Sequence, residues 1–297
     1  MRRFLITVLA LTVFSVSGYT NEEIPQTQAF HNSITPPAPI IEEIISFENE
    51  KYILADENFS NLQLEKIDTP IYDKYSIEER QARGLTTNLP EIAPYREESV
   101  AYLTFDDGPD DTVTPQILDT LKRENVKATF FVLGNMVEKN PQVLKRIFDE
   151  GHAIGNHSYN HVYSELYKSP YDFVDQMIKT DEIIKAQIGV RPLIIRAPGG
   201  AAGVFNNDYW ATLDYCGYVE YDWNICTQDA TASAPNASTQ INNVIKQLGN
   251  EPPRTLIILM HSKGDNEETA KALPELIHML RNWGYKFGVV TPMTPQF

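Results

Sequence analysis

From Glu98 to the C-terminus, short apolar runs alternate with stretches that have the periodicity of amphipathic helices. The apolar runs are Val100–Phe105, Ala128–Leu133, His152–Ile154, Leu193–Ile195, Val219–Trp223, Thr255–Met260 and Lys286–Val290. The helical stretches include Pro115–Glu124, Pro141–Glu150, Tyr171–Ile188 and Ala270–Trp283. This alternation predicts an α/β fold with a parallel sheet that is covered by helices. Seven such units in roughly 200 residues favour a barrel over an open sheet.

The segment before this alternation is acidic and lacks strong periodicity. Residues 19–98 hold 16 acidic and 6 basic side chains. We therefore divide the chain into an acidic spacer or N-terminal extension at residues 19–96 and a main domain at residues 97–297. The spacer is expected to have some local order, and part of it could form a strip that packs onto the main domain. Ser76, followed three residues later by Glu79, predicts the start of a short helix there.

The net charge of the whole chain is −15, which bears on its partners. Nucleic-acid binding requires a basic surface that neutralises phosphates, so we expect no nucleic-acid partner. The ordinary effect of such a charge is solubility. An apolar content of 42% is enough for a chain of 297 residues to build a hydrophobic core.

The first residues have the pattern of an export signal. Arg2 and Arg3 precede an apolar run from Phe4 to Val16, and small residues accompany the end of the run. A run of about 13 apolar residues matches a signal-peptide core and is short for a membrane span. We therefore predict a signal peptide at residues 1–18, or an N-terminal anchor if it is not cleaved. The protein is expected to be secreted or extracytoplasmic, in the cell envelope, and to contact a membrane only through an uncleaved leader.

The chain has two cysteines, Cys216 and Cys226. In an exported protein they could form one disulfide. They could equally be two buried thiols, and the sequence leaves both alternatives open.

Polar side chains of catalytic or metal-binding types follow five of the apolar runs. They are Asp106 and Asp107, then His157 and His161, then Arg196, Asp229 and His261. The carboxyl ends of the strands in a parallel α/β barrel form one rim, and catalytic groups lie on that rim. We therefore expect these side chains to meet in one site.

Asp107, His157 and His161 form a plausible metal site. Two imidazoles and one carboxylate suit Zn²⁺, or another divalent ion such as Co²⁺, and leave positions open for water and substrate. Asp-Asp-Gly-Pro is also good turn chemistry, so the aspartate alone would be a weak indication. A structural zinc is normally closed by four protein ligands, and only three are counted here. His152 lies in an apolar strand, and we interpret it as a structural core histidine.

The motifs that contain these residues resemble those of the NodB-homology polysaccharide deacetylases, a family of carbohydrate esterases. Residues 104–109 (TFDDGP) resemble the first motif, and residues 157–161 (HSYNH) resemble the second. Residues 196–200 (RAPGG) and 259–261 (LMH) resemble the third and the last motifs. The resemblance spans about residues 97–292 and implies a distorted (β/α) barrel of seven or eight units.

The resemblance also implies a role for each residue of the site. Asp107, His157 and His161 would bind the metal. Asp106 would be the general base, held by Arg196. His261 would be the general acid, oriented by Asp229. The backbone N–H of Gly199 would stabilise the oxyanion. The metal would polarise the acetyl carbonyl and acidify its water, and the acid would protonate the departing amine.

Three positions depart from the family pattern. Ala230 follows Asp229 where a Trp is usual, Cys226 stands where an earlier Asp often falls, and Gly199 replaces a common aromatic residue. The changes at Ala230 and Gly199 remove bulk near the expected acetyl pocket, so they bear on the choice of substrate more than on the reaction type.

The expected activity is metal-dependent hydrolysis of N-acetyl groups on an extracellular polysaccharide, with peptidoglycan N-acetylglucosamine as the leading substrate. O-acetyl xylan esterase, chitin deacetylase and exopolysaccharide deacetylase are alternatives that share the motifs. A non-catalytic glycan-binding protein is a further alternative, but such proteins usually lose a ligand or the base. Here the three ligands, the base and the acid are all present.

Overall fold

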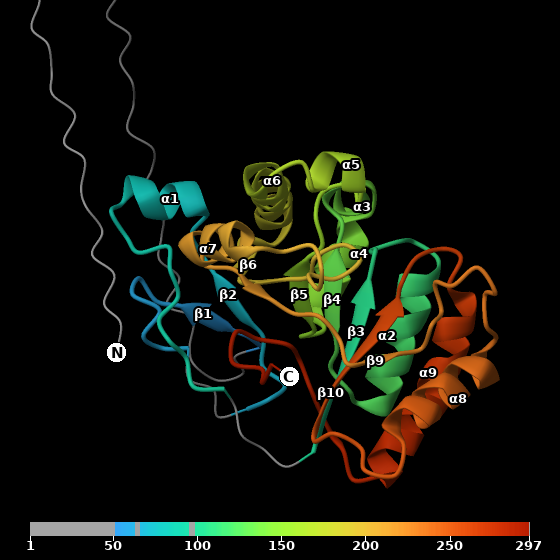
Figure 1. Ribbon diagram of the computed structural model, residues 1–297. Coiled ribbons are helices and arrows are strands. Elements are labelled where there is room, and N and C mark those ends of the chain that lie inside the picture. The colour runs from blue at the N-terminus through green and yellow to red at the C-terminus, as the bar shows by residue number, and fades with distance from the viewer. Residues whose placement is uncertain (1–50, 63–65, 95–98, 297) are drawn as a thin grey trace, which may run out of the picture. The chain divides into compact units, whose positions relative to one another are not determined.

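A computed structural model gives the fold of residues 51–62, 66–94 and 99–296 (Figure 1). The predicted signal segment at residues 1–18 and residues 19–50 of the predicted spacer lie outside the described residues. None of the helices in the described part of the chain combines the length and the apolar character that a membrane crossing requires. The described residues fall within one compact unit, Phe47–Phe297.

The main sheet is parallel and curled. Its strands follow the order β8-β7-β5-β4-β3-β10-β9, and β11 also pairs with β3. Their bounds are β3 (Val100–Asp106), β4 (Thr129–Val132), β5 (Ala153–Asn156), β7 (Ile194–Ile195), β8 (Val219–Glu220), β9 (Ile225–Cys226), β10 (Thr255–His261) and β11 (Lys286–Gly288). All of these pairings are parallel. The α/β fold and the distorted barrel predicted from the sequence are therefore confirmed (Figure 1).

Helices alternate with the strands along the chain and cover the sheet (Figure 1). Their bounds are α2 (Val113–Glu124), α3 (Gly134–Lys139), α4 (Pro141–Asp149), α5 (Tyr163–Leu166), α6 (Pro170–Ile188), α7 (Asn207–Tyr215), α8 (Ala237–Leu248) and α9 (Glu267–Asn282). The longest, α6, shows why they form. Ser169 caps its N-terminus by accepting a hydrogen bond from Asp172 N, Pro170 occupies the first turn, and Gly189 ends it in the left-handed conformation.

The core lies between the sheet and the helices. α2 packs against α9, and α9 packs against α8. Residues buried in this core include Leu103, Phe105, Ile117, Leu121, Phe130, Ile258, Leu273 and Leu276. Burying such side chains stabilises the fold by roughly 1.5–3 kcal/mol each. The rigid sheet that results fixes the strand ends on which the polar residues lie.

The predicted spacer contributes a structured layer to the same compact unit. Its described part contains β1 (Ile53–Ala55), β2 (Ile71–Asp73) and α1 (Ile77–Ala82). A second sheet has the order β1-β2-β6, in which β6 (Arg191–Pro192) pairs antiparallel with β2. The short helix predicted at Ser76 is confirmed, because Ser76 and Glu79 form a reciprocal capping box. Residues 51–62 and 66–94 thus pack onto the barrel rather than linking to it loosely.

A cluster of buried charges joins this layer to the barrel. Asp73 of β2 accepts hydrogen bonds from Arg80 of α1 and from Arg191 of β6. Arg191 also lies 3.6 Å from Asp181 of α6, and Asp181 in turn accepts a hydrogen bond from Asn156 of β5. The side chains of Asp73, Arg80 and Arg191 are fully buried, so each charge depends on the others for compensation.

Two further sequence predictions concern single residues. His152 is buried, its Nδ1 accepts a hydrogen bond from Ala128 N, and burial lowers the pKa of its imidazole to about 3. It is therefore a neutral core histidine, as predicted. Cys216 and Cys226 are both free thiols in the structure; Cys216 is buried, as the second alternative expected, whereas Cys226 is half-buried. Burial raises the pKa of the Cys216 thiol to about 11.

Candidate active site at the strand ends

The curled sheet brings the predicted residues to its carboxyl edge. β3 and β10 pair in a register that places His261 beside Asp106. β5 ends one residue before His157, and β7 ends one residue before Arg196. Strands that lie apart in the sequence therefore deliver their polar side chains to one place. This is the convergence that the sequence predicted.

Asp107, His157 and His161 lie together as a cluster with metal-binding geometry. The Oδ1 atom of Asp107 lies 3.6 Å from Nε2 of His157 and 3.6 Å from Nε2 of His161. One ligand atom from each residue lies within 4.8 Å of the other two. Asp107 Oδ1 is buried and accepts no hydrogen bond from any described residue. A buried acceptor without a partner is costly, and a divalent cation between the three atoms would satisfy it.

The loops that carry these candidate ligands have unusual backbone conformations. Asp107, Ser158 and His161 have φ values of 71°, 77° and 60°. Residues other than glycine rarely adopt this left-handed region, and such strain gathers at functional sites. Ser158 helps to hold the second loop, because its Oγ accepts a hydrogen bond from His161 N and its own N–H donates to Asn156 Oδ1. The backbone is thus held in a shape that turns both histidines toward Asp107.

A hydrogen bond sets the tautomer of His157. Its Nδ1 lies 2.8 Å from the backbone oxygen of Arg196. A carbonyl oxygen can only accept, so Nδ1 carries the proton and Nε2 presents its lone pair toward Asp107. Metal-binding histidines commonly have such a second partner. The geometry therefore suits His157 as a ligand through Nε2.

Arg196 is fully buried behind Asp106. Its Nη1 donates to Asp106 Oδ1 at 2.9 Å and to Thr104 Oγ1 at 2.7 Å. Its Nε donates to the backbone oxygen of Tyr221 at 2.8 Å. The guanidinium also lies 4.2 Å from the centre of the Phe131 ring. Arg196 is therefore rigid, and the sequence-based expectation that it holds Asp106 agrees with this contact.

Asp229 and His261 form a second charged pair. Asp229 Oδ1 lies 2.8 Å from His261 Nδ1, and its Oδ2 accepts hydrogen bonds from His261 N and Thr269 Oγ1. Burial alone would lower the pKa of His261, but the hydrogen bond and the charge of Asp229, together with Asp106, raise it above its ordinary value. His261 is thereby favoured in its protonated form, which suits a proton donor.

Lys263 was not predicted to belong to the site. Its Nζ donates to Asp107 Oδ2 at 3.0 Å, opposite the oxygen that faces the histidines. Burial would raise the pKa of Asp107, but His157, His161, His261 and Lys263 together lower it below the ordinary value. The only signal in the sequence was that Lys263 stands two residues after His261.

The loop after β7 passes over the site. Gly199 is exposed and has a φ of 79°, and its backbone N–H donates to no described residue. Tyr167 Oη donates to the backbone oxygen of Pro198 at 2.6 Å. Of the residues that depart from the family pattern, Ala230 is exposed and Cys226 is half-buried. Trp223 lies 5.7 Å from the guanidinium of Arg196, on the same side of the barrel.

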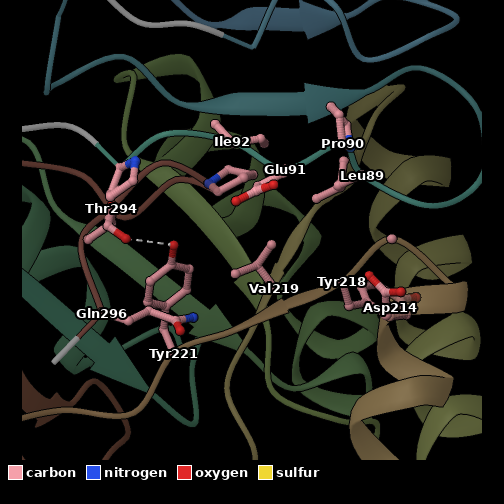
Figure 2. Close-up of a pocket in the computed structure, with 13 residues that line it drawn as sticks. Leu89, Pro90, Glu91, Ile92, Asp214, Tyr218, Val219, Tyr221, Thr294 and Gln296 are labelled. Carbon is pink, nitrogen blue, oxygen red and sulfur yellow. Dashed lines mark hydrogen bonds between the residues drawn. The ribbon is translucent and has the colours of Figure 1, made fainter. Parts of the chain in front are cut away.

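A cavity of about 570 Å³ is lined by another set of residues (Figure 2). Leu89, Pro90 and Ile92 line it from the N-terminal layer, and Thr294 and Gln296 line it from the C-terminal segment. Figure 2 shows the Tyr221 hydroxyl donating to the backbone oxygen of Thr294 at 3.0 Å. None of the predicted catalytic or metal-binding residues lines this cavity.

Comparisons with known sequences identify a matching family and several similar proteins. Residues 94–221 match a family described as polysaccharide deacetylase. Two proteins of Bacillus cereus, each named peptidoglycan-N-acetylglucosamine deacetylase, are similar to this chain. One is 42% identical over 203 residues, which cover 67% of this chain and 70% of the relative. The other is 34% identical over 200 residues, which cover 66% of this chain and 88% of the relative.

The fold has a counterpart among solved structures. The structure of a Streptococcus mutans CE4 esterase matches with a TM-score of 0.62 and 29% sequence identity. The match covers 71% of this chain and 94% of that chain. The similarity therefore extends over most of the barrel described above.

Proposed function

This chain belongs to the polysaccharide deacetylase family, and on that premise we propose that it removes acetyl groups from N-acetylglucosamine in peptidoglycan. That the chain belongs to this family confirms the resemblance seen in its sequence. The protein is therefore a hydrolase that acts on N-acetyl groups. The peptidoglycan substrate is supported by the names of the two Bacillus cereus relatives. The observation that carries the proposal is the position of Asp106 and His261 beside the Asp107–His157–His161 cluster.

We propose that Asp107, His157 and His161 hold a divalent ion, with Zn²⁺ as the first choice and Co²⁺ as the alternative. The support is the set of donor atoms: one buried carboxylate oxygen without a hydrogen bond, and two imidazole nitrogens at 3.6 Å from it. When bound, such an ion polarises the acetyl carbonyl and lowers the pKa of a bound water.

In this proposal, Asp106 takes the proton of the attacking water. Its Oδ1 is held by Arg196, whereas its Oδ2 lies 3.7 Å from Nε2 of His157, on the side of the ligand cluster. As the water oxygen forms a bond to the acetyl carbon, Oδ2 accepts the proton. Arg196 keeps the carboxylate in position and compensates its charge.

The remaining residues act on the tetrahedral intermediate. The free N–H of Gly199 is available to donate a hydrogen bond to the oxyanion. As the carbon–nitrogen bond breaks, His261 donates its proton to the amine, and Asp229 holds Nδ1 so that Nε2 carries that proton. The products are acetate and a sugar with a free amine.

We also propose that the protein works outside the cytoplasm. The support is the predicted signal or anchor at residues 1–18, whose basic start and apolar run are typical of export. A cell-wall polymer is a substrate that an exported enzyme would reach. Fractionation of cells that express the full chain would test this, and recovery in the cytosol alone would contradict it.

The activity is tested by acetate release from the full chain supplied with Zn²⁺, on peptidoglycan, chitin oligomers and acetylated xylan. We expect release from peptidoglycan, and a loss of roughly 100-fold or more in Asp106→Asn, because general-base catalysis contributes about that much. Asp111→Asn, which changes an exposed aspartate nearby, is the matched control. Release from acetylated xylan alone would refute the peptidoglycan proposal, and full activity in Asp106→Asn would refute its role as base.

A further inference from the structure

The side chain of Tyr163 fills the space above Gly199. A Cβ atom added to Gly199 would lie 2.5 Å from the hydroxyl oxygen of Tyr163 and 3.2 Å from its Cζ atom. Carbon atoms do not approach other heavy atoms so closely without displacing them. A side chain at position 199 would therefore require the Tyr163 hydroxyl to move, because the two would overlap in their present positions. An aromatic ring from α5 takes the place that a side chain on the loop after β7 would occupy.

The ring also lies against the metal-binding cluster. Its centre is 5.3 Å from the centre of the His161 imidazole, at an interplanar angle of 36°. On its other side it packs edge-on against Tyr167, with centres 5.7 Å apart. Tyr167 is fixed in turn by its hydrogen bond to Pro198. Tyr163 therefore stands between a candidate metal ligand and the loop that carries the candidate oxyanion donor.

The ring and the hydroxyl group of Tyr163 are accessible to a ligand. Its side chain is 52% exposed although it packs on three neighbours. Its hydroxyl makes no hydrogen bond with any residue in the described part of the chain. An exposed ring with an unused donor, next to reacting groups, is suited to a ligand with an apolar face and polar edges.

We propose that Tyr163 is a specificity-determining residue that contacts the sugar bearing the acetyl group. The ring packs against the C–H face of that sugar, and the hydroxyl donates a hydrogen bond to one of its oxygens. This inference rests on the proposed function, because it assumes that the substrate lies at the Asp107–His157–His161 cluster. It assigns the wall of the sugar site to the pair Tyr163 and Gly199; the glycine suits both its φ of 79° and the position of the tyrosine ring.

The first test measures acetate release from a tetramer of N-acetylglucosamine by the full chain with Zn²⁺. We expect Tyr163→Ala to raise KM by about 10-fold or more, and Tyr163→Phe by a smaller factor of about 2- to 10-fold, the usual effect of one hydrogen bond. Zinc affinity, measured by titration, should be unchanged in both variants. Tyr171→Ala changes a tyrosine that is 74% exposed on α6, and it serves as the control.

The second test measures the coupling between the two positions. Gly199→Ala in the wild type should lower kcat/KM more than the same change in the Tyr163→Ala background, where the steric conflict is gone. The strain of the positive φ is common to both backgrounds and cancels in the comparison. Equal effects in the two backgrounds would overturn the steric coupling between the two positions, and unchanged KM in both tyrosine variants would overturn the sugar contact.

A binding measurement separates this inference from the proposed function. The same tetramer is titrated into Asp106→Asn and into Asp106→Asn/Tyr163→Ala, so that no turnover is needed. Weaker binding by about 10-fold in the double variant supports the contact even if the wild type releases no acetate, in which case only the proposed function fails. Equal binding by the two proteins overturns the inference whether or not the wild type is active.

Discussion

At the scale of single residues, two carboxyl groups lie below the loop that carries Gly199. Glu220 is buried and accepts a hydrogen bond from Ala197 N at 3.3 Å, while Asp222 accepts one from Ala201 N at 3.0 Å. Burial and the charge of Asp222 raise the pKa of Glu220 to about 8. Glu220 is therefore protonated at neutral pH and can donate to Asp222, whereas two carboxylates would repel each other.

A stability prediction follows for Glu220→Gln. The folded state keeps the Glu220 proton up to about pH 8, while the unfolded chain loses it near the ordinary value of 4.5. The contribution of this carboxyl group to the free energy of unfolding is therefore fully present below pH 4.5. It is lost as the pH rises toward 8, because the unfolded chain releases the proton and the folded protein does not. Glutamine does not titrate, so at pH 7 the variant should be the more stable protein, by on the order of 3 kcal/mol.

Chemical denaturation at a series of pH values from 4.5 to 8 measures this difference. The advantage of Glu220→Gln should grow across that range, while Glu251→Gln, an exposed glutamate, should show no such trend. A constant difference between Glu220→Gln and the wild type at every pH would show that Glu220 is already ionised in the folded protein.

The residues that carry the chemistry could be predicted because each belongs to a short motif at a strand end. Asp106, His157 and His261 are examples, since the order of the strands alone brings them to one edge. Lys263 could not be predicted in this way. Its position depends on how a loop folds back over the cluster, and a pattern of apolar residues carries no information about that.

At the scale of elements, the N-terminal layer is held to the barrel by buried charge. Asp73 on β2 compensates Arg80 on α1 and Arg191 on β6, and all three side chains are fully buried. The same cluster continues through Asp181 to Asn156, the residue before the candidate ligand His157. A change in the layer is therefore expected to affect the fold of the barrel as a whole.

We expect Asp73→Asn to lower the free energy of unfolding by about 3–5 kcal/mol, because it leaves two buried guanidinium groups without full compensation. Asp68→Asn, at an exposed aspartate of the same layer, should change it by less than about 0.5 kcal/mol. Denaturant titration of the full chain measures both. If Asp73→Asn lowers the free energy of unfolding no more than the control does, the buried cluster does not hold the N-terminal layer to the barrel.

The elements themselves were predicted with unequal success, for physical reasons. The stretch Tyr171–Ile188 corresponds to α6 because its apolar residues repeat at helical spacing over many turns. The pairing of β6 with β2 had no such signal, since Asp73 and Arg191 meet across a sequence separation of 118 residues. Local patterns predict which elements form, whereas contacts between distant short strands depend on the packed whole.

At the scale of the whole molecule, the curled sheet is what makes the site possible. Five of its strands lead to one or more of the catalytic and metal-binding candidates at the same edge, and helices on the outside hold the sheet in that shape. The described part of the chain offers one cluster of metal-binding side chains, at this edge. We therefore expect the full chain to bind one ion and to need it for turnover.

The most direct test is removal and return of that ion, with acetate release from peptidoglycan as the readout. The full chain is treated with a chelator, dialysed, and titrated with Zn²⁺, in parallel with His161→Gln. We predict that release stops after chelation and returns fully at about one equivalent of Zn²⁺, and that His161→Gln needs at least about 10-fold more metal. Acetate release that continues after chelation, or a His161→Gln protein that titrates like the wild type, would contradict the account.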